Sequence, residues 1–86
     1  MSANSEATVV LPADLHARPA GALVRAAAGF TSIVEIIAGE RRVSARSVLG
    51  VMGLNARAGT PVVVSATGDD AVAAVAALAV MLSSFE

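Results

Sequence analysis

The chain contains no cysteine, lysine, tryptophan or tyrosine, and it has a single histidine. Without cysteine it cannot form a disulfide, a thiolate metal site or a cysteine nucleophile. One histidine also excludes an ordinary multi-histidine metal centre, so we expect no metal and no cofactor. Six arginines stand against seven acidic residues, and the two aromatic residues are Phe30 and Phe85. Because nucleic-acid binding needs a basic field and stacking aromatics, we expect no direct nucleic-acid partner.

Long hydrophobic runs are missing as well. The longest wholly apolar segment, residues 71–82, has twelve residues and is largely alanine. It is too short to span a membrane, so we predict a buried-face helix and no membrane insertion. Residues 1–6 lack the positive start of a signal peptide, which predicts a cytoplasmic protein. A length of 86 residues predicts one domain, residues 1–86, whose core is too small to enclose a deep substrate cavity.

The segment LHARPA, residues 15–20, contains the only histidine. His16 can act as a nucleophile near neutral pH. Pro19 is well tolerated in the first turn of a helix, so we predict a helix that begins at or just after His16. The backbone N–H groups at that helix start, together with the permanent charge of Arg18, would face any anionic group on the imidazole. A lone histidine is more often a helix cap, so this segment alone leaves both roles open.

Apolar periodicity and turn residues divide the chain into seven short elements. The predicted strands cover residues 7–11, 31–38, 41–44 and 61–66. The predicted helices cover residues 17–28, a short segment from the N-cap Ser47 to about Leu54, and a last helix that begins at Asp69 or Asp70. The order β-α-β-β-α-β-α favours the α+β class, with an antiparallel sheet and helices on one face.

Single residues support these boundaries. Gly29 stands where a C′ glycine would end the first helix. Pro61 is tolerated only as the first residue of its strand, and the valines that follow it predict a central position in the sheet. The acid before the last helix is expected to act as its N-cap. The core-facing stripe of that helix is expected to comprise Val72, Val75, Leu78 and Leu82.

Two motifs together resemble a known family. Residues 15–20, LHARPA, are followed by residues 44–54, SARSVLGVMGL, at the spacing found in HPr, the histidine phosphocarrier family of the bacterial phosphoenolpyruvate-dependent sugar phosphotransferase system. The resemblance spans nearly the whole chain and is far more specific than an isolated His-x-Arg-Pro. It implies an open-faced β-sandwich, in which three helices cover one face of a four-stranded antiparallel sheet with strand order 1-4-2-3.

The resemblance also implies the chemistry. His16 matches the family's phosphorylated histidine, whose Nδ1 accepts a phosphoryl group from Enzyme I and passes it to sugar-specific IIA domains. Arg18 matches the active-site arginine and would stabilise that group. The residues expected to dock partners are Ala20, Arg25, Arg46, Val48, Leu49 and Met52. We expect a monomeric carrier rather than an independent catalyst, because the chain has too few convergent groups for a self-sufficient site.

Ser47 raises the question of regulation. It matches a serine that a dedicated kinase modifies in many Gram-positive relatives, which adds a serine kinase/phosphorylase and a transcriptional regulator to the partners considered. Its plainer role is that of a helix N-cap, worth about 1 kcal/mol against alanine, and the sequence leaves both roles open. A regulatory HPr-like module of a nitrogen-branch or transcription-control pathway is the alternative function.

Asp14 departs from the family pattern, which usually has glycine immediately before the leucine of the first motif. Its carboxylate could repel an incoming phosphoryl group, or it could cap a turn. The departure bears on the rate of transfer rather than on the role of His16.

Overall fold

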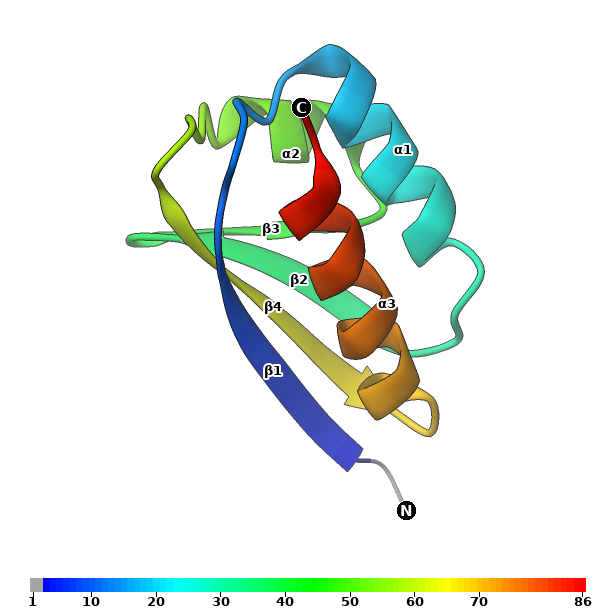
Figure 1. Ribbon diagram of the computed structural model, residues 1–86. Coiled ribbons are helices and arrows are strands. Elements are labelled where there is room, and N and C mark those ends of the chain that lie inside the picture. Colours follow the sequence, from blue (N-terminus) through cyan, green and yellow to red (C-terminus); the bar gives the residue numbers. More distant parts are fainter. Residues whose placement is uncertain (1–2) are drawn as a thin grey trace.

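Residues 3–86 form a four-stranded antiparallel sheet with three helices on one of its faces (Figure 1). The computed structural model describes residues 3–86. In chain order the elements are β1 (Ala3–Val10), α1 (Ala17–Ala27), β2 (Ile33–Ala38), β3 (Arg41–Ser44), α2 (Val48–Gly53), β4 (Pro61–Gly68) and α3 (Ala71–Ser84). The strand order is β1-β4-β2-β3. The predicted fold class, element order and strand order are therefore confirmed.

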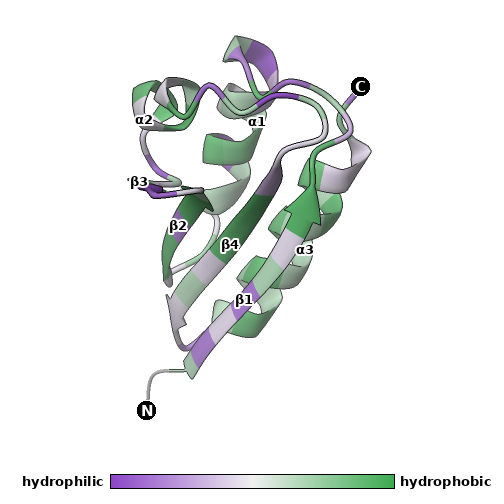
Figure 2. Cartoon of the chain, turned by 90° about the vertical axis from the view of Figure 1, so that its left-hand side faces the viewer, coloured by the Kyte–Doolittle hydropathy of each residue, from purple (hydrophilic) through white to green (hydrophobic). Residues whose placement is uncertain are grey.

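Strand β4 lies at the centre of the core, as its run of valines predicts. It pairs with β1 on one side and with β2 on the other. Val62, Val64 and Ala66 are buried on the face that carries the helices, because alternate side chains of a strand point to the same side. Pro61 is its first residue, as predicted. Figure 2 shows that hydrophobic residues gather in β4, whereas β3 and the start of β1 are hydrophilic.

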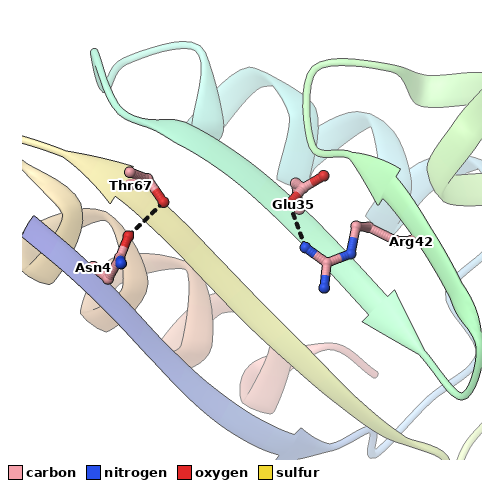
Figure 3. Close-up of polar contacts among 4 residues, drawn as sticks. All are labelled: Asn4, Glu35, Arg42 and Thr67. Atoms are coloured by element: carbon pink, nitrogen blue, oxygen red, sulfur yellow. Dashed lines mark hydrogen bonds and ion pairs between the residues drawn. The ribbon is translucent and has the colours of Figure 1, made fainter.

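Strand β1 is longer than predicted, because it begins at Ala3 rather than at residue 7. Its first half is polar and resembles a loop in the sequence. The opposite face of the sheet carries no helix, so polar side chains there cost nothing in desolvation. Asn4 lies opposite Thr67 of β4, and the Thr67 hydroxyl donates a hydrogen bond of 2.7 Å to Asn4 Oδ1 on this open face (Figure 3). The strand is longer because its backbone pairs with β4 as far as Ala3, and backbone hydrogen bonds do not depend on the polarity of the side chains.

Helix α3 packs along β1 and β4, but one residue of its predicted buried stripe is exposed and two alanines are buried in addition. The buried residues are Ala71, Ala74, Val75, Leu78 and Leu82. Val72 is 66% exposed, so its predicted place in the core is wrong. Ala71 takes the sheet-facing position instead, and the next residue projects about 100° further round the helix. None of the helices in residues 3–86 is long and apolar enough to cross a membrane.

Asp70 occupies the N-cap position of α3, yet its side chain makes no hydrogen bond to that helix. The carboxylate instead accepts the Thr31 backbone N–H at 2.8 Å, the Ser32 backbone N–H at 2.9 Å and the Ser32 hydroxyl. The predicted local cap is therefore wrong for Asp70, because the carboxylate joins α3 to the start of β2. These hydrogen bonds, first that from the Ser32 side chain, lower the pKa of Asp70 to about 2.

The turn before Asp70 requires glycine for two reasons. Gly68 has φ +147°, in the region that side chains disfavour. A Cβ at this position would also lie 2.6 Å from Ser32 Oγ and 2.8 Å from Ser32 Cα. The turn at Gly68 thus brings the end of β4 directly against the start of β2.

Helix α1 ends close to its predicted limit but by a different route. Ala28 is the C-cap and keeps right-handed helical angles. Gly29 does not adopt a positive φ, and its N–H donates to the Ala26 carbonyl at 3.1 Å. The helix therefore closes with a tightened last turn rather than with a left-handed glycine. On its inner face Leu23 and Ala27 are fully buried.

Candidate functional site

His16 is the N-cap residue of α1, so the predicted helix start is confirmed. Its backbone is extended, and its carbonyl accepts the Ala20 N–H at 2.9 Å. Its side chain makes no capping hydrogen bond and is exposed. The preceding Leu15 is buried and donates its N–H to the Ala56 carbonyl at 2.8 Å, which anchors the segment. The exposed imidazole therefore stands on an anchored backbone.

The first turn of α1 supplies positive charge beside His16. The first N–H groups of a helix have no intrahelical partner and carry the positive end of its dipole. Pro19 has no N–H of its own, so no hydrogen bond is lost by placing it in this turn. Arg18 is exposed, and its guanidinium donates no hydrogen bond to another group within residues 3–86. The arrangement fits an anionic group carried on the imidazole.

His16 lines two depressions of the surface. The first, of about 460 Å³, is shared with Arg18, Pro19 and residues 84–86 and is here called the Arg18 depression. The end of α3 lies beside the start of α1 (Figure 1), and residues of both line this depression. The second, of about 280 Å³, is shared with residues 14 and 15, Met52 and residues 55–57 and is here called the Arg57 depression. Both lie at the surface, as expected of a chain too small for a deep cavity.

Asp14 has a structural task in this region. Its Oδ1 accepts the Ala58 backbone N–H at 2.8 Å. The carboxylate was expected either to cap a turn or to repel an incoming phosphoryl group. It does accept a backbone hydrogen bond, but the bond holds the loop at Ala58 rather than a local turn. The carboxylate remains exposed and lines the Arg57 depression beside His16.

Helix α2 begins as predicted at the N-cap Ser47, whose Oγ accepts the Gly50 N–H at 2.9 Å. Only Val51 of this helix is buried. The exposed side chains form an apolar surface, here called the α2 surface, which comprises Val48, Leu49 and Met52 at 38%, 82% and 37% exposure. Exposed apolar side chains gathered on one short helix are typical of a binding surface.

The cations expected near this surface differ in their surroundings. Arg46 donates to the Phe30 carbonyl at 3.0 Å but remains exposed, and Arg25 is exposed in the last turn of α1. Ala20, in contrast, is 0% exposed. The expectation that Ala20 docks a partner does not hold, because its methyl group belongs to the core beneath α1.

Sequence reasoning missed two contributors to the surroundings of His16. Arg57 and residues 84–86 each line a depression that contains the imidazole. Both are more than 35 residues away from His16 in the sequence. The turn residues Asn55 and Gly59 indicate a loop, and their φ values of 51° and 89° confirm it. No local pattern, however, shows that this loop lies against His16.

The strand order and the helices on one face of the sheet define a small open-faced sandwich. An exposed histidine stands at the start of its first helix. Histidine phosphocarriers belong to this class. The family model described as "PTS HPr component phosphorylation site" matches residues 3–84. The chain therefore belongs to the HPr family, and the family resemblance seen in its sequence is confirmed.

Individual relatives agree with this assignment. The chain is 40% identical over 76 residues to phosphocarrier protein HPr of Lysinibacillus sphaericus, covering 88% of this chain and 86% of that protein. It is 38% identical over 79 residues to a multiphosphoryl transfer protein of Xanthomonas campestris, covering 92% of this chain but only 9% of that protein. The crystal structure of phosphocarrier protein HPr from Bacillus anthracis superposes with a TM-score of 0.82 at 31% identity, covering 94% and 96% of the two chains.

Proposed function

We propose that this HPr-family chain accepts a phosphoryl group on His16 from Enzyme I, which takes it from phosphoenolpyruvate, and passes it to IIA domains of sugar permeases. The observation that carries the proposal is the exposed imidazole at the start of α1 in a chain that the family model matches over residues 3–84. Phosphocarrier activity in the phosphotransferase system is the role of the family. The particular donor and acceptors are what the proposal adds.

The transfer chemistry follows from the position of His16. The lone pair of Nδ1 attacks phosphorus, and the donor's bond to phosphorus breaks with its electron pair remaining on the donor. The helix N-terminus and Arg18 then offset the charge of the phosphoryl oxygens, with terminus effects of about 0.3–1 kcal/mol at an exposed site. Because the group stays at the surface, the same geometry allows it to leave for an acceptor. This weak stabilisation suits a carrier, which must both load and unload.

The α2 surface supports a protein partner at this site. Met52 lies in the α2 surface and also lines the Arg57 depression that contains His16. A partner that docks on the α2 surface would therefore also lie next to the depression that contains His16. Arg25 and Arg46 would add charge complementarity to a partner with acidic groups, which mainly raises the rate and specificity of association. We assign docking to Val48, Leu49, Met52, Arg25 and Arg46.

Intact mass spectrometry tests the proposal. The chain is incubated with phosphoenolpyruvate, Mg²⁺ and Enzyme I, and it is expected to gain one phosphoryl group that is labile in acid and stable in base. The His16→Ala variant is expected to gain none. Because His16 is the only histidine, an acid-labile phosphoryl group on the alanine variant would show that the assigned site is wrong.

A further inference from the structure

The Arg57 depression contains a cation that the transfer chemistry described above does not use. Arg57 is exposed and lines this depression together with His16. His16 thus shares one depression with Arg18 and a second one with Arg57. Each of the two depressions that His16 lines therefore also contains one arginine.

The backbone around Arg57 is fixed to the segment that carries His16. On one side of Arg57, the Ala56 carbonyl accepts the Leu15 N–H at 2.8 Å. On the other side, the Ala58 N–H donates to Asp14 Oδ1 at 2.8 Å. These two bonds join the residues before and after Arg57 to the two residues before His16. The ordering of this loop is therefore already present in the unloaded protein, which lowers the entropy cost of an interaction through Arg57.

Arg57 itself is held in the turn by its own backbone. Its N–H donates to Thr60 Oγ1 at 3.2 Å, and its carbonyl accepts the Thr60 N–H at 2.9 Å. Both backbone polar groups of Arg57 are thus satisfied within the loop. The side chain is the part of this residue that is left to interact with another molecule or group.

The arginines of the chain divide into two groups by their hydrogen bonds. Three donate to acceptors elsewhere in the protein, namely Arg41 to the Gly53 carbonyl, Arg42 to Glu35 and Arg46 to the Phe30 carbonyl. The guanidinium groups of Arg18, Arg25 and Arg57 donate no hydrogen bond within residues 3–86. Of these three, Arg18 and Arg57 each line a depression with His16. The Asp14 carboxylate in the Arg57 depression forms no ion pair within the described residues, where Arg42–Glu35 is the one found. A guanidinium there offsets the repulsion that Asp14 exerts on an incoming phosphoryl group.

From this geometry we propose that Arg57 is a second phosphoryl-binding residue, which donates to the phosphoryl oxygens on His16 from the Arg57 depression while Arg18 does so from its own. The inference rests on the proposed phosphocarrier function. As the bond from Nδ1 to phosphorus forms and the donor's bond breaks, the three remaining oxygens keep their negative charge. A planar guanidinium with several N–H donors suits such a group better than a point charge does. Arg57 thereby permits an acid, Asp14, where the family usually has glycine.

The test uses a phosphoryl donor that has no protein surface. Phosphoramidate transfers its phosphoryl group to histidine with ammonia as the leaving group, and the single histidine makes the added mass specific for His16. Arg57→Ala is expected to slow phosphorylation about three- to tenfold with phosphoramidate as well as with Enzyme I, as for loss of one exposed charged donor. Arg57→Lys is expected to recover part of the rate with both donors.

Arg42→Ala is the matched control. It removes the same charge, but Arg42 is paired with Glu35 on the open face of the sheet, away from the helices (Figure 3). Its rates are expected to equal those of the wild type. Thermal unfolding of each variant checks that the fold is intact, which the exposure of both arginines favours.

The outcomes separate the inference from the proposed function. The inference is overturned if Arg57→Ala accepts the phosphoryl group from phosphoramidate at the wild-type rate. This holds even if the variant reacts more slowly with Enzyme I, because that pattern would assign Arg57 to docking. An equal loss in Arg42→Ala also overturns it, since net charge would then be the cause. Failure of the proposed function looks different, because wild-type protein would then react with phosphoramidate but not with Enzyme I.

Discussion

Asp70 shows how one carboxylate joins two elements that are distant in the sequence. It accepts hydrogen bonds from both backbone and side chain at residues 31 and 32, and its pKa is lowered from 3.8 to about 2. A carboxyl group whose pKa falls on folding stabilises the folded state above the pKa of the unfolded chain. That contribution is lost as the pH falls through the folded-state value.

We therefore expect Asp70→Asn to lower the free energy of unfolding at pH 7, because the amide cannot accept both backbone N–H groups as the carboxylate does. The difference between variant and wild type should shrink as the pH falls from about 4 to about 2, the interval between the two pKa values. Urea unfolding at a series of pH values measures it. Asp69→Asn is the matched control, since Asp69 makes no side-chain hydrogen bond within residues 3–86. A destabilisation of Asp70→Asn that is the same at both ends of this interval would contradict the assignment.

At the scale of the element, α2 combines a structural cap with the α2 surface. Ser47 Oγ caps the helix through the Gly50 N–H at 2.9 Å, while Leu49 two positions later is 82% exposed. The Arg41 guanidinium donates to the Gly53 carbonyl at the opposite end of the helix. A change of charge at Ser47 therefore acts on two properties, the stability of the helix and the contact that its exposed side makes.

For Ser47→Asp we expect a melting temperature that is unchanged or slightly higher, because aspartate is a good N-cap and its charge suits a helix start. We expect phosphorylation of His16 by Enzyme I to be about three- to tenfold slower, because a charge at the edge of the α2 surface must be desolvated on docking. Differential scanning calorimetry and initial rates from intact mass measure the two effects.

Ser47→Ala provides the comparison for that variant. It removes the capping acceptor, which is expected to cost about 1 kcal/mol of stability, and it leaves the transfer rate close to that of the wild type. Transfer by Ser47→Asp at the wild-type rate would remove the docking role from α2. Parallel losses of stability and rate in both variants would show that Ser47 acts only as a cap.

At the scale of the whole molecule, the fold was predictable where the signals are local. The valines of β4, the turn glycines and the N-cap Ser47 each depend on a few neighbouring residues, and the structure agrees with them. The strand order came from the family resemblance, because pairing partners leave no local trace.

The site was predictable in part for the same reason. His16 and Arg18 lie in one short motif. Arg57 lines a depression with His16 because residues 14 and 15 are hydrogen-bonded to the loop at 56–58. The prediction that Asp70 caps its own helix was wrong because the groups that donate to its carboxylate belong to residues 31 and 32, far away in the sequence. Ala20 was misjudged because a docking residue and a core residue of the same helix differ only in the direction they face, and the neighbouring elements decide that direction.

The central claim is that His16 carries a phosphoryl group between two proteins, and a relay experiment tests it most directly. The chain is first phosphorylated by Enzyme I and phosphoenolpyruvate, and both are then removed. The phosphorylated chain is mixed with an isolated IIA domain, and the intact masses of both proteins are followed. We expect the phosphoryl mass to leave this chain and to appear on the IIA domain faster than it hydrolyses, and His16→Ala to transfer none. A loaded chain that loses its phosphoryl group only to water, at the same rate with and without every IIA domain tested, would contradict the account.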